Sequence, residues 1–282
     1  MSPSLFSGRK LCIATKHEKE SVIAPILENA LDVNCFVPDA FDTDILGTFS
    51  GEIERKDSPI ETARKKCRMA MEATGCDLAV ASEGSFGSHP TLFFVPADEE
   101  FILLMDAKNN LEIIARYLST ETNFGGESVS SWEQLKAFAE KSKFPEHGLI
   151  IKNQEKDWSY LNKGIQDEKE LKESFEECIQ AHGSVFVETD MRAMVNPLRM
   201  EAIAKATKEL TRKIALECPN CSMPGFDVVE HQSGLPCAQC SMPTKSTLQD
   251  LYRCQHCDFE EIRKFPRGKE QEDPMYCDFC NP

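Results

Sequence analysis

Four pairs of cysteines, each with two residues between its members, lie in the last 65 residues of the 282-residue chain. The pairs are Cys218 and Cys221, Cys237 and Cys240, Cys254 and Cys257, and Cys277 and Cys280. A two-residue interval lets both sulfurs of one tight turn reach the same metal, and a hairpin can return a second turn opposite the first. The gaps of 15 residues between the first two pairs and 19 between the last two fit such a hairpin. The pattern predicts two zinc ions, each held by four cysteines.

The sequence leaves the pairing and the metal open. Consecutive pairing is the preferred assignment, because each quartet then closes a short loop independently, and interleaved, cross-braced pairing is the alternative. Iron in an all-thiolate site and disulfide bonds are the other interpretations of the same spacing. The residues that follow each pair, Ser222, Ser241, Asp258 and Asn281, are small or turn-tolerant types that suit a tight turn around a metal.

The cysteine tail also suggests how the chain divides. A segment of 65 residues with few large apolar side chains buries too little surface to offset its ordering entropy, so it needs metal or cross-links. We therefore expect an α/β domain over residues 1–217 and a tandem four-cysteine zinc-ribbon module over residues 218–282. The two zinc ions are expected to be structural.

The charge disfavours nucleic acid as a partner. The chain has 47 acidic and 32 basic residues, a net charge of −15, and the tail by itself has ten acidic and six basic residues. Such a balance opposes binding through phosphate neutralisation and favours a stabilising ribbon or one that docks a protein partner. No segment reads as a signal peptide or a membrane span, so a cytoplasmic protein without membrane contact is expected. In that reducing compartment, Cys-x-x-Cys pairs usually mean metal or redox chemistry.

Two further motifs could carry chemistry in the first domain. They are Thr15-Lys-His-Glu-Lys19 and the predicted turn Ser82-Glu-Gly-Ser-Phe-Gly87, each after a predicted strand. The hydroxyl of Thr15, the side chains of Lys16, His17 and Lys19 and a following helix N-terminus suit an anionic ligand, while Glu83 suits a hard cation such as Mg²⁺. The alternative for both motifs is a solvated helix start and an ordinary glycine turn.

The predicted elements place both motifs at the same edge of a sheet. We expect strands over residues 11–15, 33–37 and 77–81, helices over residues 18–31 and from Ser58 to Gly75, and a loop or lid between them from Pro38 to Asp57. Residues 91–95, 101–106 and 111–119 are predicted as an antiparallel meander, with a solvated acidic turn at Asp98-Glu99-Glu100. Because ligands of open α/β sheets bind at the carboxyl ends of strands, this edge is the expected site.

The remaining part of the domain reads as a second set of alternating elements. Helices are expected over residues 132–141, 167–181 and 198–217, and strands over residues 148–152 and 184–188. The predicted fold class is therefore α/β, a mixed sheet with flanking helices, followed by the small zinc-ribbon module.

In their order along the chain, these motifs resemble those of the inosine/xanthosine triphosphate pyrophosphatase superfamily. The matching pieces are Ala14-Thr-Lys-His-Glu-Lys19, Ser50-Gly51, Glu61-Thr-Ala-Arg64 and Val80-Ala-Ser-Glu-Gly84, over roughly the first 120 residues. His17 stands where the family has asparagine, and Lys19 is one position early for its phosphate lysine. The resemblance implies a Mg²⁺-dependent hydrolase of nucleoside triphosphates with Glu83, Lys19 and Glu61 as catalytic residues, and with Thr15, Lys16, His17 and Arg64 in contact with substrate.

The whole chain is more closely similar to an uncharacterised family, a domain of unknown function with C-terminal cysteine pairs. Thr189-Asp-Met-Arg-Ala193, Asn196-Pro-Leu-Arg-Met200 and the ribbon tail carry this resemblance. It points to Asp190, Arg192, Asn196 and Arg199, which are predicted to cluster between a strand end and the start of the last long helix. They are either substrate contacts or an ion-paired corner.

These observations lead to a hypothesis for function. The first domain is expected to be a magnesium-dependent hydrolase of nucleotides or other phosphorylated small molecules, in which positioning and charge neutralisation supply most of the rate. The alternative is a non-enzymatic module that binds a ligand or a protein and carries structural zinc ribbons.

Overall fold

A computed structural model describes residues 5–38 and 57–282 of the chain. These residues form two compact units, Met1–Thr211 and Arg212–Pro282. The boundary expected at residue 217 lies just before the first cysteine pair, in the second unit. The predicted lid, apart from Pro38 and Asp57, falls outside the described residues, and so do Ser50 and Gly51.

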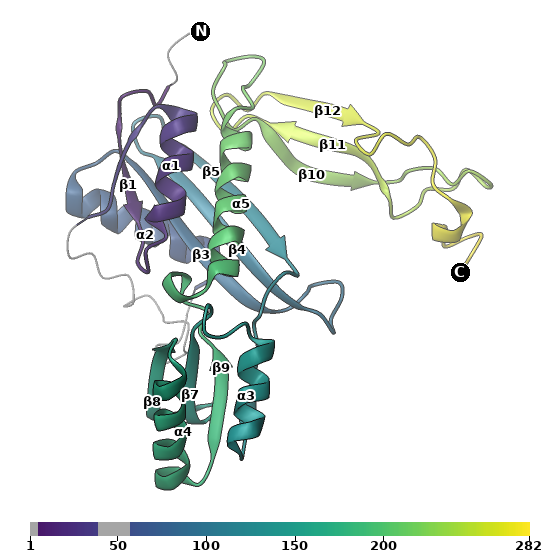
Figure 1. The fold of residues 1–282 in the computed structure, drawn as a ribbon. Coiled ribbons are helices and arrows are strands. Elements are labelled where there is room, and N and C mark those ends of the chain that lie inside the picture. Colours follow the sequence, from purple (N-terminus) through teal and green to yellow (C-terminus); the bar gives the residue numbers. More distant parts are fainter. Residues whose placement is uncertain (1–4, 39–56) are drawn as a thin grey trace. The chain divides into compact units, whose positions relative to one another are not determined.

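The first unit opens with a five-stranded mixed sheet in the order β2-β1-β3-β4-β5 (Figure 1). Its strands are β1 (Lys10–Ala14), β2 (Asn34–Phe36), β3 (Leu78–Ser88), β4 (Pro96–Asp106) and β5 (Leu111–Ser119). Strand β1 pairs in parallel with β2 and β3, whereas β3, β4 and β5 form an antiparallel meander. The α/β fold class with a mixed sheet is thus confirmed.

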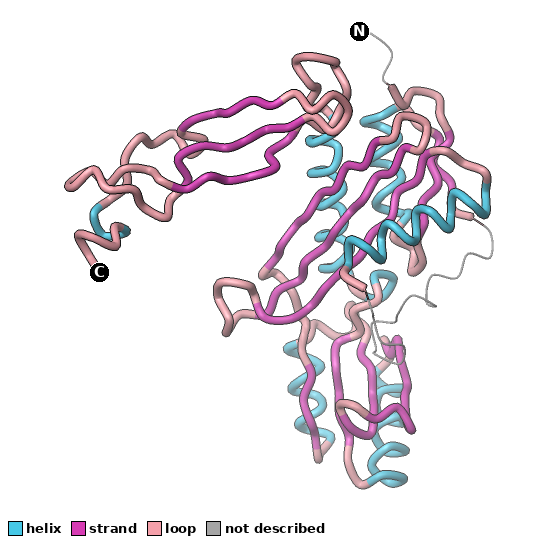
Figure 2. Tube along the Cα trace, turned by 180° about the vertical axis from the view of Figure 1, so that it is seen from behind, coloured by secondary structure: helices cyan, strands magenta, loops and turns pink. Residues whose placement is uncertain are grey.

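Helices cover both faces of this sheet. Helices α1 (Glu20–Leu31) and α5 (Pro197–Ile214) lie on one face, and α2 (Pro59–Thr74) crosses the other, as Figures 1 and 2 show from opposite sides. Ser58 caps α2 by accepting a hydrogen bond from the Glu61 backbone, and Gly75 ends it in the left-handed conformation, as its sequence predicts. The small side chains of Ala63, Cys67 and Ala70 let α2 pack closely on the sheet.

The meander differs from the expected one in a way that changes the site. Strand β3 runs unbroken from Leu78 to Ser88, so the predicted turn at residues 82–87 is wrong, and the reversal of the chain lies between Ser88 and Pro96 instead. The predicted acidic turn at residues 98–100 is also wrong, because these residues belong to β4, where Asp98 and Glu100 are buried. Glycine and charged residues can occupy a strand when the partner strand supplies hydrogen bonds and the packed helices supply counter-ions, and local sequence reveals neither.

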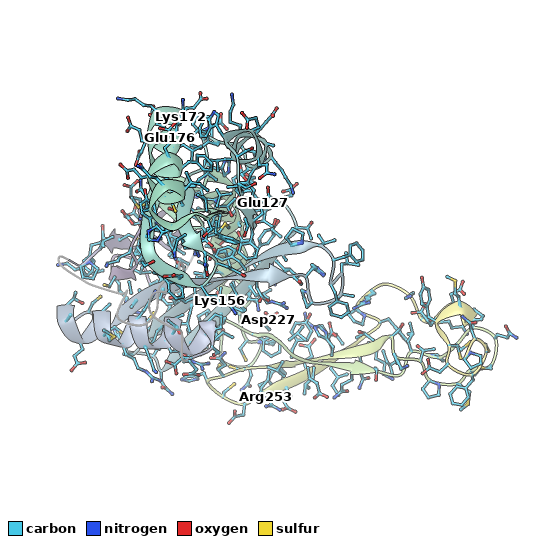
Figure 3. The ribbon with its side chains drawn as sticks, turned by 90° about the horizontal axis from the view of Figure 1, so that it is seen from below. Glu127, Lys156, Lys172, Glu176, Asp227 and Arg253 are labelled. Atoms are coloured by element: carbon cyan, nitrogen blue, oxygen red, sulfur yellow. The ribbon has the colours of Figure 1, made fainter. Side chains whose placement is uncertain are left out.

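A second sheet of four strands follows in the order β6-β9-β7-β8. It consists of β6 (Gly126–Val129), β7 (Leu149–Gln154), β8 (Asp157–Ile165) and β9 (Val185–Thr189), with helices α3 (Trp132–Lys141) and α4 (Glu168–His182). Strands β6 and β8 were not predicted. The outward side of α4 is charged, and Lys172 and Glu176 lie one turn apart on it, with 3.8 Å between Nζ and Oε1 (Figure 3). A short 3-10 turn (Ala193–Val195) connects β9 to α5.

The second unit contains a three-stranded antiparallel sheet, β10 (Asp227–Ser233), β11 (Thr247–Arg253) and β12 (Glu260–Lys264), and a 3-10 turn over Pro274–Tyr276. Its apolar cluster is small: Phe226 packs with cysteines of the tail, and Tyr252 and Phe259 lie against it. In the described part of the chain, no helix has the length and apolar character needed to span a membrane.

Candidate metal centres and a buried charged cluster

The eight tail cysteines form two groups of four. One group is Cys218, Cys221, Cys254 and Cys257, and the other is Cys237, Cys240, Cys277 and Cys280; within each, all four sulfurs lie within 4.8 Å of one another. Sulfur pairs that join the two turns of a group are 3.6 to 3.8 Å apart. Four sulfurs at about 2.3 Å around a tetrahedral zinc would be roughly 3.8 Å apart, whereas a disulfide requires about 2.0 Å. The tetrads are therefore compatible with two structural metal ions.

The preferred consecutive pairing is wrong, and the interleaved pairing is confirmed. Strand β10 carries the chain away from the first cysteine pair, and β11 returns it, so the third pair lies opposite the first. Strand β12 then leads away again to the fourth pair, opposite the second. A seven-residue strand spans about 23 Å, far more than one metal bridges. Spacing along the chain suggested local closure because it does not show that the intervening residues form a strand.

Each cysteine pair sits in a tight turn that the following residue completes. Ser222, Ser241 and Asp258 have φ values of 57°, 60° and 57°, in the left-handed region. Their backbone N–H groups donate to the carbonyl of the first cysteine of the pair, as in Ser222 to Cys218 at 2.8 Å. Asn281 makes the same bond to Cys277. The turn-tolerant residues after each pair thus have the role that the sequence predicts for them.

A buried charged cluster lies in the first unit, on the face of the sheet that α1 and α5 cover. Antiparallel register places Gly84 opposite Glu100 and Phe86 opposite Asp98, so these four residues project to the same face. Arg199 of α5 donates from Nε to Glu100 Oε1 at 2.7 Å, and both side chains are fully buried. A Cβ on Gly84 would lie 2.5 Å from Glu100 Oε1, so only glycine leaves room for this ion pair.

Lys19 reaches into this cluster from the start of α1. Its Nζ lies 3.1 Å from Ser82 Oγ and is almost completely shielded from solvent. Burial, together with the nearby Arg199 charge, lowers the pKa of Lys19 to about 7, although Glu100 and Glu83 act in the opposite direction. Lys19 is thus an amine whose protonation changes in the neutral range and would respond to an added anion.

Two carboxylates of the cluster have a buried oxygen without a hydrogen bond. Within residues 5–38 and 57–282, neither Asp98 Oδ1 nor Glu100 Oε2 has a hydrogen-bond partner. Burial, with repulsion from Glu100, raises the pKa of Asp98 to about 8. Unsatisfied buried carboxylate oxygens are costly, and a bound cation is one of the ordinary reasons for them.

The predicted catalytic carboxylates lie elsewhere. Glu83 projects to the opposite face of β3, where it is ion-paired with Lys66 of α2. Glu61 is half exposed and pairs with Arg64, whose Nη2 also lies 2.6 Å from Oε1 of Glu112. Of the predicted catalytic residues, only Lys19 joins the cluster around Glu100, and Glu83 acts on it through its charge.

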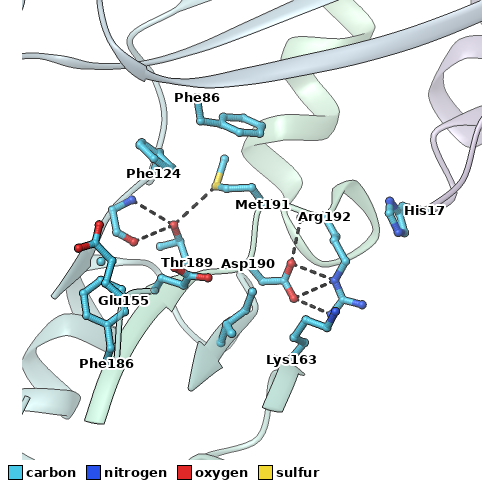
Figure 4. Close-up of a pocket in the computed structure, with 14 residues that line it drawn as sticks. His17, Phe86, Phe124, Glu155, Lys163, Phe186, Thr189, Asp190, Met191 and Arg192 are labelled. Carbon is cyan, nitrogen blue, oxygen red and sulfur yellow. Dashed lines mark hydrogen bonds and ion pairs between the residues drawn. The ribbon is translucent and has the colours of Figure 1, made fainter. Parts of the chain in front are cut away.

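A cavity of about 270 Å³ meets this cluster at Phe86, which lines the cavity and lies opposite Asp98 in the sheet, while Asp98, Glu100 and Lys19 are not among the lining residues. Phe86 and Phe124 stack with their ring centroids 5.8 Å apart on one side of it, and the Arg199 guanidinium lies 5.0 Å from the centroid of the Phe86 ring. His17 and Lys163 line the cavity on the same side as Arg192 (Figure 4). His17 has a φ of 66°, a conformation that residues with a side chain seldom adopt. Thr15 and Lys16 are not among the residues that line the cavity; the Thr15 hydroxyl donates to the Lys16 carbonyl at 3.0 Å.

The four residues predicted to cluster between β9 and α5 do so. Arg192 donates from Nη2 to Asp190 Oδ2 at 2.6 Å, and Asn196 Nδ2 donates to the Asp190 carbonyl at 3.2 Å. The Arg199 backbone N–H donates to Asn196 Oδ1 at 3.1 Å, and its guanidinium donates to the Met191 carbonyl. Asp190 and Arg192 line the cavity, while Asn196 and Arg199 are fully buried and do not line it.

Comparison with known proteins identifies the family. A family model described as a domain of unknown function, DUF6671, matches residues 66–282. The chain belongs to the DUF6671 family. The DUF6671 match includes both cysteine tetrads, Glu100 and Arg199, whereas Lys19 and His17 precede it. No curated protein matches the chain.

A solved structure, the crystal structure of protein VC0702 from Vibrio cholerae, is similar to this DUF6671 chain at 9% identity with a TM-score of 0.33. The likeness covers 72% of this chain and 93% of that one. A similarity this low carries no argument about fold or function.

Sequence reasoning missed two residues of the cluster, Asp98 and Glu100, and it also missed Lys66, which pairs with Glu83 on the opposite face of the sheet. The signal for the two carboxylates was available in principle, because Asp98 and Glu100 continue the alternation of buried Ile102 and Leu104 on one face of the strand. Charge masked that alternation, since three acidic residues in a row usually mark a solvated turn. Lys66 gave no signal, because a lysine on a helix is most often exposed.

The cross-braced pairing can be tested by metal content. We expect Cys221→Ser combined with Cys257→Ser to lose one equivalent of metal, because both belong to one tetrad, and Cys221→Ser combined with Cys240→Ser to lose two. Mass-spectrometric metal analysis of purified protein gives the count, with Cys35→Ser as a control that retains both equivalents. Equal losses in the two double variants would contradict the pairing.

The raised pKa of Asp98 predicts a pH dependence of stability. Between pH 4 and 8 the folded state keeps a proton on Asp98 that the unfolded state has lost, so its contribution to stability falls as pH rises, by about 1.4 kcal/mol per pH unit for one full proton. Asp98→Asn mimics the protonated form and removes this slope. In urea unfolding from pH 5 to 9, the free energy of unfolding of the variant should rise relative to that of the wild type up to about pH 8 and stay constant above it. Parallel curves would show that Asp98 titrates normally.

Proposed function

We propose that the first unit binds a phosphorylated small molecule, with a nucleotide as the leading candidate, and hydrolyses it with the help of a divalent cation such as Mg²⁺. The observation that carries the proposal is the pair of buried oxygens, Asp98 Oδ1 and Glu100 Oε2, beside the cavity and on the same face of the sheet as Lys19. A cavity, unsatisfied carboxylates and a lysine with a lowered pKa are features that converge in active sites.

The donor set fits Mg²⁺ better than a softer metal. Only oxygen ligands are offered, and Mg²⁺ is commonly held by one or two carboxylates, with waters and substrate phosphate oxygens completing its octahedron. The two cysteine tetrads are the only groups of three or more ligating side chains in the described residues that could hold an ion without a substrate. Asp98 and Glu100 would therefore bind the cation together with the phosphate groups of the ligand.

The chain's own residues would do the rest. Arg199 fixes one Glu100 oxygen and leaves the other toward the cation. Lys19, whose charge is costly in the empty site, would take up a proton as a phosphate group arrives, because an adjacent anion favours the charged form. The cation would polarise the phosphorus centre and neutralise its developing charge.

The test is a panel of nucleotides assayed with Mg²⁺ for released phosphate and pyrophosphate. We expect turnover that requires added Mg²⁺ and falls about 100-fold or more in Glu100→Gln and Asp98→Asn, since each change removes a charged cation ligand. Glu99→Gln is the matched control, because Glu99 lies between these residues but projects to the other face and pairs with Arg116. Wild-type activity is expected in that variant.

Omission of Mg²⁺ is preferable to chelation in this assay, because a chelator would also remove any metal bound at the cysteine tetrads. If the wild type releases nothing from any nucleotide, hydrolysis is wrong. A thermal shift by the same nucleotides that is lost in Asp98→Asn would then assign a ligand-binding role without turnover.

A further inference from the structure

The guanidinium of Arg192 is held along one edge by the Asp190 carboxylate in the cavity. Its Nε donates to both carboxylate oxygens of Asp190, at 3.1 and 3.0 Å, and its Nη2 donates to Oδ2 at 2.6 Å. The Arg192 backbone N–H also donates to Asp190 Oδ1, at 2.9 Å. Asp190 itself is fully buried, so this clamp has little freedom to move (Figure 4).

Two glycines provide the space that this orientation needs. Arg192 follows β9 and reaches toward β8, and the start of β7 lies between these strands in the sheet. Gly148, just before β7, has no side chain there; a Cβ would lie 3.0 Å from Val195 Cβ and 3.5 Å from Asp190 Cβ. At Gly164 of β8, a Cβ would lie 2.9 Å from Arg192 Nη2. Any side chain at residue 164 would therefore displace the Arg192 guanidinium from this position.

Arg192 faces a different part of the site from the buried carboxylates. It lines the cavity with Phe186 and Lys163 of the second sheet, whereas Lys19 and Glu100 belong to the first sheet and α1. A ligand whose phosphate groups bind at Asp98 and Glu100, and which extends past Phe86 into the cavity, would bring its remaining part to Arg192. A planar guanidinium presents its donors in a fixed geometry, so its orientation selects among hydrogen-bond acceptors.

We propose that Gly164 and Asp190 are positioning residues that fix Arg192 as the contact for the part of the ligand beyond its phosphate groups. The inference rests on the proposed function for the identity of the ligand, but not for the orientation of Arg192. It assigns ligand selection to the second sheet and phosphate binding to the first.

The binding test compares two glycine variants. Gly164→Ala should weaken binding of Mg²⁺-ATP or Mg²⁺-GTP, measured by calorimetry, at least tenfold, and should leave binding of Mg²⁺-pyrophosphate unchanged within twofold. Gly183→Ala is the matched control, because Gly183 has a similar φ of 70° against 77° for Gly164, but a Cβ there meets nothing within 4 Å. This control distinguishes the effect of backbone strain on binding from the effect of the clash with Arg192.

A double-variant cycle makes the claim sharper. In an Arg192→Ala background, Gly164→Ala should have no further effect on nucleotide binding, because the group that it displaces is gone. An undiminished effect in that background would overturn the inference, and so would equal losses of nucleotide and pyrophosphate binding.

A ligand-free measurement keeps this inference separate from the proposed function. The Nε–H resonance of Arg192, assigned by its loss in Arg192→Lys, should shift in Gly164→Ala and stay in place in Gly183→Ala. If the wild type binds neither nucleotide nor pyrophosphate, the proposed function fails. The spectrum then still tests whether Gly164 positions the Arg192 guanidinium. A resonance that does not move in Gly164→Ala overturns it.

Discussion

A single buried guanidinium connects the parts of the first unit on which the candidate site depends. Arg199 is completely shielded from solvent, and it donates to Glu100 of β4 and to the Met191 carbonyl after β9. Removing one partner of a buried ion pair leaves an uncompensated charge at a cost of about 3 to 5 kcal/mol. The first sheet and the β9–α5 connection are thus held to each other by a contact whose loss would strongly destabilise the folded state.

This contact also explains why the neighbouring polar groups stay in an unfavourable environment. Burial is the main cause of the lowered pKa of Lys19 and of the raised pKa of Asp98; the positive charge of Arg199 adds to the first shift, and Glu100, which Arg199 holds in place, adds to the second. Both shifts favour neutral forms, so the cluster is arranged at a cost in stability. Costs of this kind are usual where a fold supports a binding site, because the groups are placed for a ligand rather than for each other.

The second unit lacks a large apolar core, and its order depends on the cysteine tetrads. Its described apolar cluster centres on Phe226 and cysteine side chains, too little to order the tail by burial alone. Two cysteine tetrads, compatible with two structural metal ions, lie at opposite ends of a three-stranded sheet, and the cross-braced pairing makes each tetrad depend on the strands that separate them. Metal bound at either tetrad would therefore order the sheet as well as one turn.

The sequence by itself determined what depends on neighbours along the chain. The capped helix α2, the tight turns at the cysteine pairs and the strand-then-helix start of the chain follow from residues within one or two turns of each other, where local hydrogen bonds decide. The Asp190 to Arg199 cluster was also predictable, because ten consecutive residues contain it.

Only the tertiary structure decided the rest. Pairing of β3 with β4 turned a presumed solvated turn into a buried strand and moved the candidate cation ligands from Glu83 to Asp98 and Glu100. The three-stranded sheet of the tail likewise places the first cysteine pair opposite the third and the second opposite the fourth, instead of joining consecutive pairs. In both cases the outcome depends on which face a strand presents and where its partner ends, and those are set by hydrogen bonds between residues far apart in sequence.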